Sequence, residues 1–210
     1  MDFEEDAFYR WYNFEATEDE KALYSRVVDD FGDLFEDMIF KPGTCSSELT
    51  KCHSDLEKSE IYDVLPDELA HFDYFNFHYK AEQPDDCDGY FNREEKTLCT
   101  SADAADSTIL HEMIHLHEFV INQLPMYWHD MLYWALYKNL REKIPELDNI
   151  ITGHSHLLNE SVLYKQGGLH DILFLLKSFD LDIRMGYPLG TILAYGRADD
   201  FKQYSYIKGE

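Results

Sequence analysis

Three residues in one short segment, His111, Glu112 and His115, have the types and the spacing of a catalytic zinc site. On an α-helix, residues four apart project from the same face, so the two imidazoles can bind one ion. Glu112 is expected to act as the general base rather than as a ligand, because it can take a proton from a water in the remaining coordination position. The pattern therefore predicts hydrolysis of a peptide bond, or of another amide bond, with the help of Zn²⁺.

The surrounding stretch, STILHEMIHLHEFV over residues 107–120, has the composition of a buried helix with one polar stripe. Its apolar side is formed by Ile109, Leu110, Met113 and Ile114. His117 lies about 200° around the helix from His115, so we expect it in the core or on the surface and not on the metal. Glu118 shares the face of His115 but follows it too closely to complete a tetrahedron, so we expect it behind the ligands or at the surface.

A catalytic zinc site takes three protein ligands, so one ligand must come from outside this segment. The metzincin spacing is excluded, because it requires Gly and His where the chain has Glu118 and Ile121. Glu160, on a later segment, is one candidate for the third ligand. His129 is another, because the break at Pro125 lets the chain turn and bring a second helix back toward the metal.

Three further histidines, His154, His156 and His170, are expected to be ordinary polar residues. His154 and His156 share one side only if their segment is extended, and they diverge if it is helical.

The segment STILHEMIHL and the residues that follow it resemble the SprT-like zinc metallopeptidases and the related YgjP-like group. The likeness consists of that segment, a gap of about a dozen residues, a histidine followed by an aromatic residue one helical turn later, and then WALYKNL. Upstream, GYFNREEKTLCTS is similar to the hairpin that precedes the metal helix in this family. The resemblance covers roughly residues 70–145.

By this resemblance the zinc ligands are His111, His115 and His129, the general base is Glu112, and Tyr133 is the aromatic residue after the third histidine. The chain departs from the family at Asp130, where Gly is usual. Members that act on DNA-bound proteins tend to be basic or to carry a zinc ribbon or another DNA-binding element, and this chain is acidic and has no such element. The resemblance therefore implies a zinc-dependent peptidase core more than a role in DNA repair.

Local signals place the elements that must position these residues. The sequence TEDE has the form of a capping box and begins a helix at Thr17, which apolar residues at helical spacing continue to Met38. Residues 72–79 are predicted to form a strand, and a hairpin that turns at Asn92–Glu95 follows. After the metal helix, a second helix is predicted from about His129 to Lys143.

These elements predict an α+β fold of the zincin type, with a small, mainly antiparallel sheet packed on the metal helix and additional helices around it. We expect one domain over residues 1–210, with a metallopeptidase core over 70–145. An acidic helical extension over 1–69 and a helical extension over 146–210 flank this core. A peptide substrate is expected to add as a strand to the second arm of the hairpin, KTLCTS.

The four cysteines do not indicate a zinc site, because no C-x-x-C pair exists. Cys45 and Cys52 flank a polar loop, and Cys87 and Cys99 bracket the hairpin, which is expected to place them almost opposite each other. Free thiols are the default expectation for a chain without a leader sequence.

The 210 residues carry 42 acidic against 18 basic side chains, a net charge of −24. Such a charge repels nucleic-acid phosphates and anionic membranes, so we expect a protein or peptide substrate, with basic chains as the first candidates. The N-terminal residues lack the basic and apolar regions of a signal peptide, and we expect a cytoplasmic protein.

An acidic interaction protein with a structural or relic zinc site is the alternative to the enzyme. Glu112 favours the enzyme, because a structural site does not require a carboxylate beside the open coordination position.

Overall fold

The computed structural model describes residues 3–36, 77–85, 87–122, 126–153, 170–193, 198–201 and 203–207. The chain divides into two compact units, one made of Met1–Lys41 and Ser54–His117 and the other of Pro42–His53 and Glu118–Glu210. The predicted division into a core over 70–145 with two extensions stays a prediction. Within the described ranges, no helix is both long and apolar enough to cross a membrane.

The first unit begins with helices that follow one another closely: α1 (Phe3–Arg10), the π-helical segment η1 (Trp11–Glu15), α2 (Glu18–Ser25), the π-helical segment η2 (Arg26–Asp30) and α3 (Gly32–Glu36). The predicted capping box is confirmed, because the Glu20 N–H donates to Thr17 Oγ1 at 3.2 Å and the Thr17 N–H donates to Glu20 Oε2 at 2.7 Å. The predicted apolar face is buried at Leu23, Val27, Phe31 and Phe35. The helix is interrupted at η2, and Met38 lies outside the described residues.

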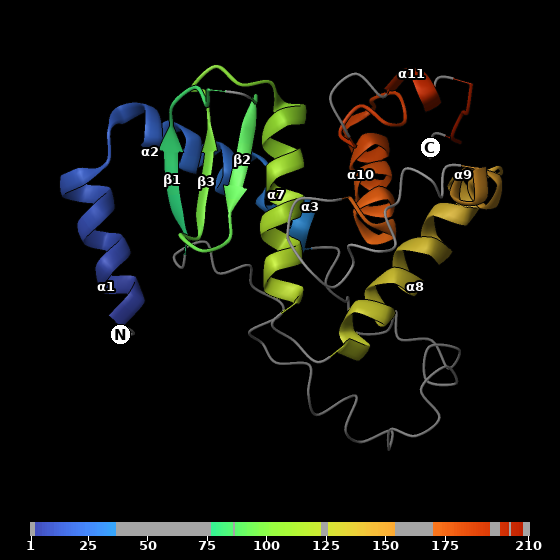
Figure 1. Cartoon of the computed structure of the whole chain (residues 1–210), viewed down its shortest axis with the longest axis horizontal. Helices are drawn as coiled ribbons and strands as arrows, with labels where there is room; N and C mark the ends of the chain where they lie inside the picture. The colour runs from blue at the N-terminus through green and yellow to red at the C-terminus, as the bar shows by residue number, and fades with distance from the viewer. Residues whose placement is uncertain are drawn as a thin grey trace. The chain divides into compact units, whose positions relative to one another are not determined.

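A three-stranded sheet of β1 (His78–Ala81), β2 (Gly89–Asn92) and β3 (Thr97–Thr100) lies beside these helices in the order β1-β3-β2 (Figure 1). β3 pairs in parallel with β1 and antiparallel with β2. The predicted α+β class and the small sheet within residues 70–100 are confirmed, and the sheet is mixed because one of its two pairings is parallel. The first part of the predicted strand, residues 72–76, lies outside the described residues.

The position of β3 at the centre of the sheet corrects one expectation. Its two edges are occupied by β1 and β2, so no substrate strand can add to KTLCTS as predicted. Each residue of β3 already has its backbone groups in a ladder with a neighbouring strand, and a further strand would find none free.

The predicted hairpin is present, with its turn between β2 and β3. The Asn92 side-chain oxygen accepts hydrogen bonds from the N–H groups of Glu94 and Glu95, at 3.0 and 3.1 Å, which explains the turn at Asn92. The expected opposition of Cys87 and Cys99 is wrong, because the register places Cys99 opposite Tyr90. Cys87 is exposed, Cys99 is buried, and both are free thiols as expected.

The sheet is packed from one side by aromatic side chains of the N-terminal helices. The ring of Tyr79 on β1 lies 5.2 Å from that of Tyr24 and 6.1 Å from that of Trp11. The metal helix α7 (Asp106–Ile121) is tied to the same helices at its first turn, because Arg26 donates to Asp106 Oδ1 at 2.6 Å and to the Ala104 carbonyl at 3.0 Å. α7 stands next to β2 (Figure 1).

The second unit contains α8 (Met126–Lys143), α9 (Leu147–Gly153), α10 (Ile172–Met185) and the short α11 (Ala198–Phe201). The predicted second helix is confirmed as α8, which begins slightly before His129. α10 packs against α8 and starts at Asp171, whose side chain accepts a hydrogen bond from the Phe174 N–H at 2.8 Å. α10 ends at Gly186, whose φ of 73° is the left-handed conformation that suits glycine.

Candidate metal centre

His111 and His115 project from one face of α7, as their spacing predicts. Their ring centroids lie 5.0 Å apart, with the ring planes at 78°. His111 is buried, with 4% of its surface exposed, and His115 is half-buried. Two imidazoles that meet inside the protein rather than in water can share an ion, and they are not the surface histidines of an ordinary amphipathic helix.

The remainder of α7 explains why these polar residues are buried. The apolar side that the sequence predicts is completely inaccessible at Ile109, Leu110, Met113 and Ile114. Burial of this side stabilises the helix against its neighbours and carries His111 and Glu112 into the interior with it.

Glu112 is almost completely buried, with 2% of its surface exposed, and it lies against β2. A β-carbon added to Gly89 would stand 3.0 Å from Glu112 Cγ and 2.9 Å from Thr100 Cγ2. The absence of a side chain at Gly89 therefore leaves the space that the stem of Glu112 occupies. The start of β2 and the stem of Glu112 are neighbours for this reason, which the sequence pattern did not show.

His117 and Glu118 take no part in the convergence of His111 and His115. The ring of His117 is in edge contact with the ring of Phe35, with centroids 5.7 Å apart, and His117 is 1% exposed. Of the two expected positions for His117, the core and the surface, the structure shows the core. Glu118 is buried, with 7% of its surface exposed, so it is not a surface residue.

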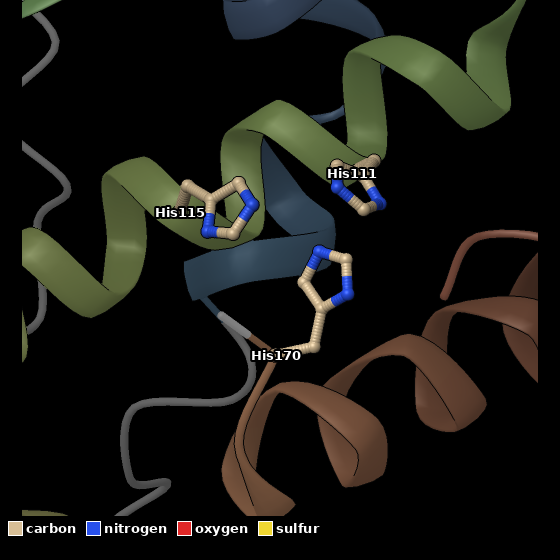
Figure 2. Close-up of side chains that lie close together, drawn as sticks. All are labelled: His111, His115 and His170. Carbon is tan, nitrogen blue, oxygen red and sulfur yellow. The ribbon is translucent and has the colours of Figure 1, made fainter. Parts of the chain in front are cut away.

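Three histidines form a group that could hold a metal ion. The ligand nitrogens of His111, His115 and His170 all lie within 4.8 Å of one another, and Figure 2 shows the three rings turned toward a common point. A tetrahedral zinc ion with Zn–N bonds of ~2.0–2.1 Å separates its ligand nitrogens by about 3.4 Å, a separation within this limit. The donor set of three imidazoles suits zinc and other divalent transition metals.

His170 precedes α10 and is held by that helix. Its ring lies over the ring of Phe174, with centroids 4.3 Å apart, and the next residue, Asp171, is the N-cap. From the sequence, His170 is expected to be an ordinary polar residue, and its grouping with His111 and His115 was not predicted. No spacing rule links it to the HExxH segment, so only the tertiary structure could identify it.

The other predicted candidates stay predictions. His129 lies on α8, but its side chain is outside the described part of the structure. The described part also does not include Glu160, His154 and His156. Tyr133 also lies on α8, where its ring stacks on Tyr137 with centroids 6.0 Å apart. Burial and the nearby carboxylate of Asp148 raise the pKa of Tyr133 above its usual value, so this phenol stays protonated at neutral pH.

Comparison with known proteins adds no relative: no family model, no curated protein and no solved structure matches the chain. What stands is the HExxH-type arrangement on α7 and a three-histidine group that could bind a metal ion.

Proposed function

We propose that this protein is a zinc-dependent peptidase, in which His111, His115 and His170 bind the metal and Glu112 is the general base. The observation that carries the proposal is the geometry of α7, where two converging imidazoles and a buried carboxylate lie within one helical turn. A metal site of purely structural function does not require a carboxylate beside the open coordination position.

A bound zinc ion would supply a Lewis acid and would lower the pKa of a coordinated water toward ~7. Glu112 takes the proton from the attacking water on its carboxylate and then delivers it to the nitrogen of the leaving amine. The backbone at Gly89 lies against the stem of Glu112, which leaves the carboxylate at the end of the side chain free to turn. His111 and His115 act only as ligands and hold no proton that moves in the reaction.

The HExxH segment, the hairpin before it and WALYKNL after it support membership of the SprT-like group, and Asp130 in place of Gly argues against it. The proposal of a peptidase does not depend on that membership, because it rests on the side chains of α7 and on the backbone of β2 at Gly89.

We place the peptide substrate on β2 instead of β3. Within the described ranges β2 pairs only with β3, so its outer edge is the one next to α7 (Figure 1). Gly89 at the start of β2 lies against Glu112, so an extended peptide that pairs with this edge would run past the general base. Backbone pairing of this kind orients a scissile bond without demanding a particular side-chain sequence.

The charge of the chain favours basic substrates. A net charge of −24 attracts cationic chains and repels nucleic acids, and this attraction weakens as salt screens it. Unstructured basic proteins are therefore the first substrates to offer, because they can also adopt the extended conformation that the edge of β2 requires.

The experiment measures zinc content and peptide cleavage in the same preparation. Zinc-loaded protein should cleave lysine- and arginine-rich unstructured peptides, and cleavage should stop when a chelator removes the metal and return when zinc is restored. Protein that binds zinc stoichiometrically but cleaves nothing across a broad peptide library would favour the alternative of an interaction protein with a structural site.

The third ligand is tested by alanine variants of the four candidate ligands, His111, His115, His129 and His170. We expect His170→Ala to weaken zinc binding strongly, as His111→Ala and His115→Ala should, because two imidazoles do not retain zinc tightly. His78→Ala removes an exposed histidine of β1 and is the matched control. If His129→Ala weakens binding and His170→Ala does not, the ligand predicted from the sequence is correct and the one proposed here is wrong.

A further inference from the structure

Thr100, the last residue of β3, has a side-chain hydroxyl that is buried without a partner. The residue is completely inaccessible to solvent, and within the described part of the chain its Oγ1 makes no hydrogen bond. A buried hydroxyl without a partner destabilises a folded protein, because it has lost its hydrogen bonds to water and gained none. Such groups are rare in native structures, and each of them calls for a reason.

A second threonine on the same strand shows the ordinary arrangement. Thr97 is also buried, with 3% of its surface exposed, but its hydroxyl donates to the Glu95 carbonyl at 3.1 Å. A buried threonine on β3 can therefore find a hydrogen-bond partner. The lack of a partner at the Thr100 hydroxyl must come from the surroundings of Thr100 itself.

That place is beside Glu112. Thr100 is paired with Gly89 across the antiparallel ladder, and residues directly opposite each other face the same side of a sheet. The point where a β-carbon of Gly89 would stand lies 2.9 Å from Thr100 Cγ2 and 3.0 Å from Glu112 Cγ. The side chains of Thr100 and Glu112 thus border the same small space.

The missing partner of Thr100 is a protein group and not solvent, because the hydroxyl oxygen is inaccessible to water. An acceptor must therefore move to it, and the carboxylate of Glu112 ends the flexible side chain that borders the space. Hydrogen bonds between catalytic groups are often long or absent without substrate and tighten when the substrate is bound.

We propose that Thr100 is a positioning residue for Glu112, an inference that rests on the proposed function. When metal and peptide occupy the site, the Thr100 hydroxyl donates to one oxygen of the Glu112 carboxylate. The other oxygen is then held toward the attacking water. Without this bond the carboxylate samples orientations that do not reach the water, so the loss appears in turnover and hardly in substrate binding.

Two substitutions separate the hydroxyl from the shape of the side chain. Thr100→Val keeps the volume and removes the hydroxyl, whereas Thr100→Ser keeps the hydroxyl and removes a methyl group. Thr97→Val is the matched control, because it removes a hydroxyl that has a partner on the same strand. For each protein we would measure the Tm of the metal-free form, the zinc affinity, the kcat and KM of peptide cleavage, and the affinity for a peptide hydroxamate.

We expect Thr100→Val to keep its zinc affinity and KM and to lose about tenfold or more in kcat, which is a part of the ~10²–10⁴-fold that a general base contributes. Its hydroxamate affinity should fall similarly, because the hydroxamate hydroxyl needs the Glu112 carboxylate as acceptor. Thr100→Ser should retain most of both. In the metal-free form Thr100→Val should melt no lower than wild type, whereas Thr97→Val should melt lower.

The outcomes separate the role of Thr100 from the proposed function. If Thr100→Val matches wild type in kcat and hydroxamate affinity, or if Thr100→Ser loses as much as Thr100→Val, the hydroxyl has no positioning role. If wild-type protein binds zinc but neither cleaves peptides nor binds the hydroxamate, the proposed function fails and the role of Thr100 fails with it.

Discussion

Two helices of this molecule, α7 and α10, bury polar side chains, and they do so in different ways. In α10 the ten residues from Leu173 to Asp182 are all buried, including Lys177, Asp180 and Asp182. The Asp182 carboxylate accepts hydrogen bonds from the N–H groups of Gly190 and Ile192, at 2.7 and 3.1 Å, while Asp180 lies 3.9 Å from both Lys143 and Arg184.

In α7 the buried polar residues His111 and Glu112 are followed by His115, and the two imidazoles converge with ring centroids 5.0 Å apart. The partners of the α10 acids are cations and backbone N–H groups of the same unit, which hold a loop and a neighbouring helix in place. The imidazole nitrogens of α7 face one another, an arrangement that a cation completes. Burial of polar groups alone thus does not mark a functional site, and the direction in which the groups point does.

The largest effect is expected from the general base. Glu112→Gln keeps the size of the side chain and removes its basicity, so it should retain zinc and folding while kcat falls by ~10²–10⁴. Glu142→Gln, which changes an exposed glutamate of α8, is the control and should keep its activity. Peptide cleavage by the zinc-loaded variants is the measurement. Wild-type turnover in Glu112→Gln would contradict the mechanism.

A pH-dependent effect is expected from Asp182. Burial raises the pKa of Asp182 from 3.8 to about 7, against the opposing effect of its hydrogen bonds to backbone N–H groups. The folded state therefore binds a proton more tightly than the unfolded state, and the stability from this proton is complete below about pH 4 and lost as pH rises through about 7. Its size is on the order of a few kcal/mol.

Asp182→Asn removes this titration and one acceptor for the 190–192 backbone. The free energy of unfolding is measured for both proteins in the metal-free form. The value for the variant minus the value for wild type should increase as pH rises from about 5 to about 8, because only the wild type loses stability over this range. A difference that does not change with pH would show that burial does not raise the pKa of Asp182.

A smaller effect is expected at the contact between β2 and α7. Gly89→Ala places a β-carbon within 3.0 Å of Thr100 and Glu112 side-chain atoms and 3.2 Å from the Cys99 carbonyl. It should destabilise the fold by about 1–3 kcal/mol and lower kcat by displacing Glu112. Gly153→Ala, where nothing lies within 4 Å of the new carbon, is the control. Unchanged activity in Gly89→Ala would separate Gly89 from the catalytic site.

The smallest effect is expected at the N-terminus of α10. Asp171→Ala removes the cap on the Phe174 N–H and should lower the free energy of unfolding by about 1 kcal/mol. Because His170 is the adjacent residue, zinc affinity should also decrease slightly. Thermal unfolding and a zinc titration would show both changes. Loss of stability without any change in zinc affinity would argue against His170 as a ligand.

The sequence predicts those features that depend on local rules. The capping box at Thr17, the turn at Asn92 and the convergence of His111 with His115 each follow from a few neighbouring residues, and all are present. The α+β class and the order of elements could be predicted for the same reason.

Features that depend on contacts between distant segments could not be predicted. The parallel pairing of β1 with β3 has no signal in either strand, and it is this pairing that closes the second edge of β3 to a substrate. The same limit applies to Gly89 beside Glu112, because nothing in the spacing of these two residues records that they meet.

Anomalous diffraction at the zinc absorption edge, from crystals of zinc-loaded protein, tests the central claim most directly. We predict one strong peak within ~2.0–2.1 Å of a nitrogen of His111, His115 and His170, with Glu112 near the metal but not bound to it. A peak with His129 in the third position would correct the ligand set and leave the enzyme intact. The absence of any peak at His111 and His115 would contradict the account.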